Sequence, residues 1–347
     1  MPRFTRLSAA LTAAFVLLPG AWDRSSAQAV SAAGTTLSQR HNDGRIWRYT
    51  GPPCSGAGCP GWQMLDNNPN TAATASGGAR IYQIHNDGRI WRWTGVACSG
   101  ASCPGWQMID NNPASVAIAA TGTGFLYQQH EDGKIWRFTL TPCSGNSCPG
   151  WQMIDNNAAT STIAAGNTDL YQMHGDGKIW RYTGTPCSGA GCPGWQMLDN
   201  NPATRGIAAG GGRLYQVHQD GKIWRYTGTP CSGAGCPGWQ MIDSNPATRI
   251  IAANSDGSLY QLHSDGKIWR FTGIPCSGGG CSGWQLIDNN PASRSIVAGG
   301  GQLYQLHAGG RIWRYTGVPC SGSSCPGWQM LDNNAATAAL TSGTGRK

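Results

Sequence analysis

Residues 214–243 read LYQVHQDGKIWRYTGTPCSGAGCPGWQMID, and close variants of this stretch occur seven times between Ser38 and Trp328. The copies lie 44 or 45 residues apart, as the seven histidines of the chain show: His41, His85, His130, His174, His218, His263 and His307. Short apolar runs broken by Gly, Pro and Asp-Asn clusters at such a period are typical of β-propellers with one blade per repeat. We therefore predict an all-β chain that forms a seven-bladed β-propeller of four-stranded antiparallel blades.

Four strands are predicted within each repeat, at residues 207–209, 214–218, 222–227 and 239–243 of the copy quoted above. Asp220-Gly221 predicts a two-residue primed turn between the second and third strands. That turn would set Gln216 opposite Arg225, so Gln, Arg and His would share one face of the blade and Tyr and Trp the other. Residues 338–342 repeat the pattern of the first strand. We expect them to close the ring beside the strand that leads to His41.

The first 29 residues have the features of a secretory signal peptide. Arg3 and Arg6 give a basic start, residues 9–18 are apolar, and Ala27-Gln28-Ala29 offers a cleavage site. The apolar run is too short to span a bilayer, and no other run approaches the required length. We therefore expect a secreted protein without membrane insertion, in which residues 30–347 form a single propeller domain.

Charged side chains are scarce and scattered. Asp, Glu, Lys and Arg make up 12% of the chain, and the formal net charge is +8. The basic residues are spread one or two per repeat, whereas a nucleic-acid-binding protein concentrates them in a stripe. We therefore expect no nucleic-acid partner. The sequence leaves the oligomeric state open.

The 14 cysteines form seven pairs with identical C-x4-C spacing. In an exported chain an even count at fixed spacing predicts disulfides, and we expect each bridge to close and stiffen its own loop. Zinc is disfavoured because one C-x4-C pair supplies only two ligands. The predicted pairs are Cys54/Cys59, Cys98/Cys103, Cys143/Cys148, Cys187/Cys192, Cys231/Cys236, Cys276/Cys281 and Cys320/Cys325.

Repeated aromatic and polar side chains suggest a sugar site in each blade. Sugars lay C–H groups on aromatic rings and need donors and acceptors for their hydroxyls. The candidates are Arg92, Arg137, Arg181, Arg225, Arg270 and Arg314; His85, His130, His174, His218, His263 and His307; Trp91, Trp136, Trp180, Trp224, Trp269 and Trp313; and the rim residues Trp106, Trp151, Trp195, Trp239, Trp284 and Trp328. The alternative is that the third-strand tryptophans are core residues, that Arg and His form satisfied buried pairs, and that the rim tryptophans pack under the disulfide.

The first blade departs from this pattern, because Ser38 replaces a Tyr and Arg40 replaces an apolar residue. We therefore expect its site to be the weakest of the seven.

The acidic residues favour turns over catalysis. The Asp of the H-x-D-G turn recurs in six repeats, while the seventh has Gly309-Gly310, which preserves a turn but would abolish a metal or acid–base role. The D-N-N run is interpreted as turn and capping chemistry, with sugar contacts or a weak calcium site as the alternative. A glycosidase needs a pair of carboxylates at a defined separation, whereas the single glutamate here, Glu131, lies beside a hairpin turn. We expect no enzyme activity and no cofactor.

The order of these motifs resembles secreted β-propeller lectins. The matching elements are G-W-x-x-hydrophobic-D-N-N, a small-residue strand and L-Y-Q-x-H-x-D-G-(K/R)-I-W-R-(Y/F)-T, which together cover residues 30–343. They are similar to those of the seven-bladed fucose-binding lectins of Photorhabdus and, more loosely, of tachylectin-2. The C-S-G-x-x-C-(P/S)-G-W loop departs from that pattern. The resemblance implies multivalent binding of glycans on cell surfaces. The alternatives are a structural or protein-binding propeller and, third, a propeller glycosidase.

Overall fold

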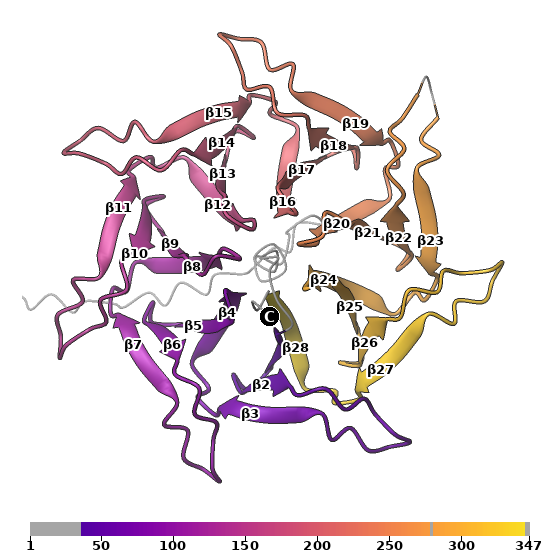
Figure 1. Ribbon diagram of the computed structural model, residues 1–347, viewed down its shortest axis with the longest axis horizontal. Helices are drawn as coiled ribbons and strands as arrows, with labels where there is room; N and C mark the ends of the chain where they lie inside the picture. Colours follow the sequence, from indigo (N-terminus) through magenta and orange to yellow (C-terminus); the bar gives the residue numbers. More distant parts are fainter. Residues whose placement is uncertain (1–35, 278–279, 344–347) are drawn as a thin grey trace, which may run out of the picture.

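Seven four-stranded antiparallel sheets surround a common axis (Figure 1). The computed structural model describes residues 36–277 and 280–343, and within these ranges the regular secondary structure is entirely β. Each sheet comes from one repeat of the sequence. The predicted seven-bladed propeller of four-stranded blades is therefore confirmed.

The four strands of each blade are arranged side by side, and they are named here in order from the centre of the ring to its rim. The first blade holds β28 (Thr337–Gly343), β1 (Thr36–His41), β2 (Ile46–Tyr49) and β3 (Trp62–Asp66). The second holds β4 (Thr71–Gly77), β5 (Arg80–His85), β6 (Ile90–Trp93) and β7 (Trp106–Asp110), and the third β8 (Ser115–Ala120), β9 (Leu126–His130), β10 (Ile135–Phe138) and β11 (Trp151–Asp155). The fourth holds β12 (Thr160–Ala165), β13 (Leu170–His174), β14 (Ile179–Tyr182) and β15 (Trp195–Asp199), and the fifth β16 (Thr204–Gly210), β17 (Arg213–His218), β18 (Ile223–Tyr226) and β19 (Trp239–Asp243). The sixth holds β20 (Thr248–Ala253), β21 (Leu259–His263), β22 (Ile268–Phe271) and β23 (Trp284–Asp288), and the seventh β24 (Ser293–Gly299), β25 (Gln302–His307), β26 (Ile312–Tyr315) and β27 (Trp328–Asp332).

The C-terminal strand closes the ring. β28 pairs antiparallel with β1, and Leu340 lies opposite Gln39 in the innermost position of the first blade. Leu340 is buried in the cluster that joins the first and seventh blades. The prediction that the last strand completes the blade begun before His41 is thus confirmed.

The hairpin between the second and third strands has a three-residue turn, so the predicted two-residue turn is wrong. In the fifth blade the His218 amide donates to the Lys222 carbonyl at 2.9 Å, which leaves three residues in the loop. A primed turn needs positive φ at both Asp220 and Gly221, but only Gly221 has it, at +83°. A Cβ on Gly221 would also lie 2.5 Å from the Asn245 carbonyl oxygen, so glycine is required there on two grounds.

The longer turn shifts the strand register by one residue and regroups the side chains. Gln216 lies opposite Trp224, and Tyr215 lies opposite Arg225. One face of each blade, called here the His–Trp face, carries Gln216, His218 and Trp224; the other, the Arg–Tyr face, carries Tyr215 and Arg225. The predicted grouping of Arg with His is therefore wrong, because a one-residue slip moves every side chain to the opposite face.

Each seam between blades joins the Arg–Tyr face of one blade to the His–Trp face of the next. At the seam after the fifth blade, Tyr215, Val217 and Ile223 pack against Ile251 and Leu259 of the sixth. Equivalent clusters of buried apolar side chains lie at the other seams. A repeat on its own would leave both of these faces in water, so the blades depend on one another for their core.

All seven predicted disulfides form, each within its own loop, so the predicted pairing is confirmed. The bridges join Cys54 to Cys59, Cys98 to Cys103, Cys143 to Cys148, Cys187 to Cys192, Cys231 to Cys236, Cys276 to Cys281, and Cys320 to Cys325. Among the described residues no cysteine is left free.

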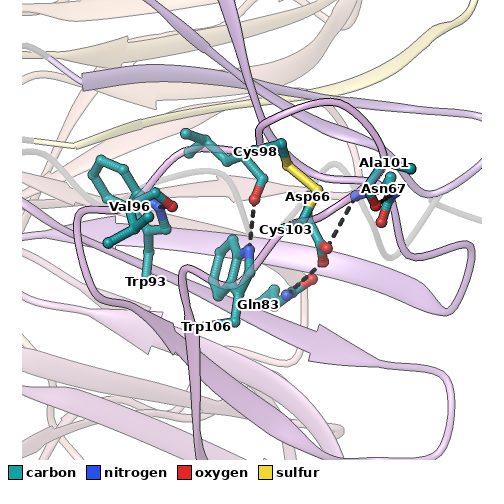
Figure 2. The surroundings of a disulfide bond; sticks show 10 residues. Asp66, Asn67, Gln83, Trp93, Val96, Cys98, Ala101, Cys103 and Trp106 are labelled. Atoms are coloured by element: carbon teal, nitrogen blue, oxygen red, sulfur yellow. Dashed lines mark hydrogen bonds between the residues drawn. A yellow bond between two sulfur atoms is a disulfide. The ribbon is translucent and has the colours of Figure 1, made fainter.

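The predicted role of the bridges, to stiffen a loop, is incomplete, because each loop also holds the outer strand of the preceding blade. Figure 2 shows the loop of Cys98 and Cys103. The Trp106 Nε1 donates to the Leu65 carbonyl at 2.8 Å, and the Asn67 side-chain amide donates to the Ala101 carbonyl at 2.9 Å. Each disulfide loop therefore clasps its blade to the one before it.

The two cysteines of a bridge differ in their contacts, which the symmetric C-x4-C spacing did not predict. The first cysteine donates its backbone amide to a carbonyl of the preceding blade's outer strand, at 3.1 to 3.3 Å, in all seven loops. The bridge joins this anchored residue to the second cysteine of the loop, which is Cys59, Cys103, Cys148, Cys192, Cys236, Cys281 or Cys325. The disulfide thereby fastens the far side of the loop to a point that is already anchored on the neighbouring blade.

The predicted signal segment, residues 1–29, lies outside the described residues. Within the described ranges there is no helical segment with the length and apolarity needed to cross a bilayer.

Candidate functional site

A cavity of about 420 Å³ lies between the second and third blades, near the rim. Residues 110–113, at the end of β7 and directly after it, form one wall. Gln128 and His130 from β9, Trp136 from β10 and Trp151 from β11 form the opposite wall, together with Cys148 and Pro149 of the disulfide loop. We call this the His–Trp pocket. It unites two of the three predicted kinds of binding residue, His and Trp.

The histidine and the third-strand tryptophan of each blade lie face to face. In the third blade the ring centroids of His130 and Trp136 are 5.7 Å apart, with planes inclined by 30°. The same pair recurs in all seven blades, at 5.7 to 5.8 Å. The aromatic wall of the pocket is thus built seven times with the same geometry.

Both rings of this pair carry a buried nitrogen without a protein partner. The His130 Nε2 and the Trp136 Nε1 accept and donate no hydrogen bond, and the same holds for both atoms in each of the other six blades. An unsatisfied buried polar group costs about 1–3 kcal/mol, so such groups normally meet a water or a ligand. Fourteen such atoms, two in each of the seven blades, indicate that a polar ligand or water binds at each His–Trp pair.

The histidine is neutral under ordinary conditions. Burial is the largest influence on His130 and lowers its pKa below the usual value, against the opposing effect of Asp132. A neutral imidazole has one nitrogen that donates and one that accepts. The pocket therefore offers both hydrogen-bonding roles within one side chain.

Side-chain hydrogen bonds hold the equivalent polar wall at the seam between the first and second blades. In the second blade the Gln83 Nε2 donates to Asp66 Oδ2 at 2.7 Å, and the Thr71 hydroxyl donates to Gln83 Oε1 at 2.7 Å. The first residue of D-N-N is therefore a buried anchor for the glutamine. At the end of β7, in the second blade, burial raises the pKa of Asp110, the residue equivalent to Asp66.

The two asparagines of D-N-N serve the loops. The first clasps the disulfide loop of the next blade, as Asn111 does by donating to the Asn146 carbonyl at 3.0 Å. The second accepts from the backbone two residues later, as Asn112 does from the Ala114 amide at 3.0 Å. The interpretation of D-N-N as turn and capping chemistry is confirmed for the second asparagine, whereas the aspartate and the first asparagine make contacts between blades. Among the described residues no group of three or more His, Cys, Asp or Glu is placed to hold a metal.

The ring of the rim tryptophan Trp151 lines the pocket, and its Nε1 forms a hydrogen bond to the preceding blade. The Trp151 Nε1 donates to the Ile109 carbonyl of the preceding blade at 2.8 Å, and its ring packs on Phe138 at 5.1 Å. This bond joins the two blades, and the alternative that the rim tryptophans pack under the disulfide stays a prediction. All seven make the same bond at 2.8 Å.

The predicted arginines lie outside the pocket. Arg137 is on the opposite face of its blade, where its guanidinium donates to Gln152 of the outer strand at 2.8 Å. Equivalent bonds hold Arg92, Arg181, Arg225 and Arg314. The prediction that the arginines share one site with His and Trp is therefore wrong, because the predicted strand register was off by one residue.

The first blade keeps a complete set of pocket residues. Ser38 and Arg40 lie on its Arg–Tyr face, which meets the second blade, while His41 and Trp47 stack at 5.8 Å on the other face. The structural premise for a weak first site is therefore wrong. Sequence reasoning left His41, Trp47 and Trp62 out of the site, although the repeat itself marks them. It placed the glutamines of the Gln83 and Gln128 series on the same face as the histidines, as observed, but did not include them among the site candidates.

Comparison with known proteins supports the fold. No protein-family model matches the sequence, and no curated protein is similar to it. Among solved structures, Prp20p from Saccharomyces cerevisiae, described with its binding to Gsp1p and histones, aligns with a TM-score of 0.56 at 12% identity over 89% of both chains. Human WBSCR16 aligns at 0.52 and 10% identity over 90% of this chain and 98% of that one. YCF48 bound to D1 peptide aligns at 0.53 and 14% identity, over 84% and 94%. These are RCC1-type and YCF48 propellers, so the lectin resemblance stays a prediction from the sequence.

Proposed function

We propose that this protein is a multivalent carbohydrate-binding protein, without catalytic activity, that holds one sugar unit at each His–Trp pocket. The observation that carries the proposal is the sevenfold recurrence of a stacked His–Trp pair whose two buried nitrogens have no protein partner. Enzymes concentrate their chemistry in one asymmetric cluster. Seven equivalent His–Trp pairs instead suit repeated weak binding.

The chemistry of the pocket suits a sugar. Trp136 and Trp151 offer ring faces for the C–H groups of a pyranose, and His130 offers a donor or an acceptor for its hydroxyls. A small polar ligand buries little area against its desolvation cost, so each site should bind only at about millimolar to micromolar Kd. Simultaneous binding of several sites to a glycan-coated surface would raise the overall affinity by about 10²–10⁴ over that of a single site.

Export fits the same proposal. Seven disulfides suit an oxidising compartment. Cell-surface glycans would be the natural partners of a protein secreted into such surroundings.

The comparisons favour a second candidate, a propeller that binds proteins. The similar structures include one described with its binding to Gsp1p and histones and one bound to a D1 peptide, at TM-scores of 0.56 and 0.53. A propeller of this kind would use its exposed loops for a protein partner. The His–Trp pockets would then hold only water.

A glycan array probed with the oxidised protein, followed by competition with free monosaccharides, separates the two candidates. The lectin proposal expects glycan binding that millimolar monosaccharide removes, with several equivalent sites per chain in calorimetry. Binding to cell-surface proteins that survives enzymatic removal of glycans, together with a blank array, would establish the second candidate instead.

Single-blade variants test whether the pocket is the site. Trp136→Phe keeps the ring stack but removes the N–H, and His130→Ala opens the pocket; each should reduce the number of sites per chain by one while the affinity of the others stays unchanged. Arg137→Gln is the matched control, because Arg137 is the residue next to Trp136 and lies on the opposite face. Equal losses in Arg137→Gln and Trp136→Phe would refute the pocket assignment.

A further inference from the structure

A second kind of cavity lies at the opposite end of a seam, between the sixth and seventh blades. Its volume is about 500 Å³. The lining includes Asp256 and Ser258 from the β20–β21 turn, Tyr260 on β21, Arg270 at the end of β22 and Tyr315 at the end of β26. We call it the Arg270 cavity. It is unrelated to the His–Trp pockets, which lie at the hairpin end of the blades.

Arg270 lacks the hydrogen bond that the equivalent arginines of the other blades make to the outer strand. In six blades the arginine of this position donates to a glutamine of the outer strand. Arg270 lies opposite Gln285 in the same register, yet within the described part of the chain it makes no side-chain hydrogen bond and no ion pair. It is also exposed, whereas the arginines at this position in the fourth and fifth blades are only half-exposed. Its charge is therefore available to the cavity.

A hydroxyl without a partner lies beside this guanidinium. The Tyr315 side chain is 8% exposed, and its hydroxyl forms no hydrogen bond. Burial raises the pKa of Tyr315, and the nearby Arg270 opposes that shift. An uncharged phenol next to a cation can donate to an anionic group that the cation attracts.

A carboxylate faces the same space without neutralising the arginine. Asp256 Oδ1 accepts from the Ser258 amide at 2.8 Å, and within the described residues Asp256 forms no ion pair. Burial raises the pKa of the Tyr260 hydroxyl, which lines the same cavity; Arg270 opposes that rise and Asp256 adds to it. The two turns that enclose the cavity are tied by Asn254, which donates to the Gln302 carbonyl at 3.2 Å and accepts from the Gly301 amide at 3.0 Å.

We propose that the Arg270 cavity binds a small zwitterion, an α-amino acid, with its carboxylate on Arg270 and the Tyr315 hydroxyl and its ammonium on Asp256. Arg314 also lines the cavity but is held by Gln329, whereas Arg270 and Asp256 do not pair with each other and present complementary charges to such a ligand. Arg270 and Asp256 are both exposed, so a ligand can reach them directly from solvent, and each can form a charge-assisted hydrogen bond with it. This site is independent of the proposed sugar binding.

Saturation-transfer NMR with an equimolar pool of the common L-amino acids, applied to the mature oxidised protein, tests the proposal. The amino acid with the strongest signal is then titrated beside its amide, which lacks the carboxylate, and its N-acetyl derivative, which lacks the ammonium. Each derivative should bind at least about ten-fold more weakly, since each loses a charged hydrogen bond. The proposal would be overturned if no amino acid of the pool showed saturable binding up to 10 mM, which is roughly the weakest affinity of a real site. It would also be overturned if the amino acid and its two derivatives bound equally well.

Matched variants locate the site. Arg270→Gln and Asp256→Asn should each weaken amino-acid binding at least about ten-fold, whereas Arg225→Gln, at the same strand position in the fifth blade, should not change it. Tyr315→Phe should weaken binding, while Tyr182→Phe serves as its control because the Tyr182 hydroxyl is also buried and unpartnered. The thermal midpoint of each variant shows that the fold persists. Equal losses in Arg225→Gln and Arg270→Gln would place the ligand elsewhere and refute the assignment.

Discussion

Removing one disulfide by the double change Cys231→Ser and Cys236→Ser should destabilise the whole ring. The bridge spans a sequence separation of 5, so it closes a loop of about six residues. The chain-entropy model gives about 2 kcal/mol for a loop of that size. For a domain of roughly 300 residues the entropy of unfolding is about 0.6 kcal/mol/K, so the thermal midpoint should fall by about 3 °C.

The clasp formed by the loop should weaken at the same time. Within the loop the Cys231 amide donates to the Met197 carbonyl at 3.2 Å, and the Ala234 carbonyl accepts from Asn200 at 3.0 Å. Trp239→Phe, which removes the bond to the Leu198 carbonyl, should cost about 1–2 kcal/mol in the oxidised protein and less in the loop variant, since contacts that depend on one another are not additive.

Equilibrium unfolding in urea and calorimetry measure both effects, with intact mass confirming that the other six bridges remain. Reducing all seven bridges removes about 14 kcal/mol in total, which is comparable to the usual stability of a protein, so the fully reduced chain should unfold at room temperature. An unchanged midpoint in the single-loop variant, or a fully reduced protein that melts like the oxidised one, would refute the reasoning.

Three further predictions concern the ring, one backbone position and pH. Deleting residues 336–347 removes β28 and should lower the thermal midpoint sharply, because β1 loses its partner strand; a deletion variant that melts like the parent contradicts this. Leu140→Gly should stabilise by about 0.5 kcal/mol in urea unfolding: Leu140 has φ +76°, where the six equivalent residues are glycines, and the left-handed strain of about 1–2 kcal/mol exceeds the entropic cost of glycine. Burial lowers the pKa of all seven histidines below 6.5, so the unfolded chain binds more protons between the lowered pKa and 6.5. Melting curves should therefore show stability falling as the pH drops from 7.5 through that window, and a flat profile would exclude this linkage.

The blade was predictable because its signals are local, whereas the site depends on register. The fourth strand was predicted at residues 239–243, and Trp239–Asp243 is the observed strand. Asp220-Gly221 marked the turn correctly, but the same dipeptide serves two-residue and three-residue turns, and only the φ of Asp220 distinguishes them. That one residue decided whether His218 shared a face with Arg225 or with Trp224.

The contacts across the seams could not be predicted for a different reason. The bond from Trp239 to the Leu198 carbonyl joins residues 41 positions apart, and the repeat alone does not say which face meets which neighbour. The missing hydrogen bond of Arg270 could not be predicted either, because its repeat contains the same glutamine, Gln285, in the same register as the other repeats.

The clasp has a direction, and this bears on the order in which the ring is assembled. Each disulfide loop reaches back to a blade that precedes it in the chain, so during N-to-C synthesis or export every new blade from the second onward meets a partner already made. The loop of Cys54 and Cys59 is the exception, since its partners Met330 and Asn333 emerge almost three hundred residues later. β28 arrives beside them and pairs with β1. The contacts of the earliest loop and the pairing of β1 with β28 can therefore form only after the last blade has been made.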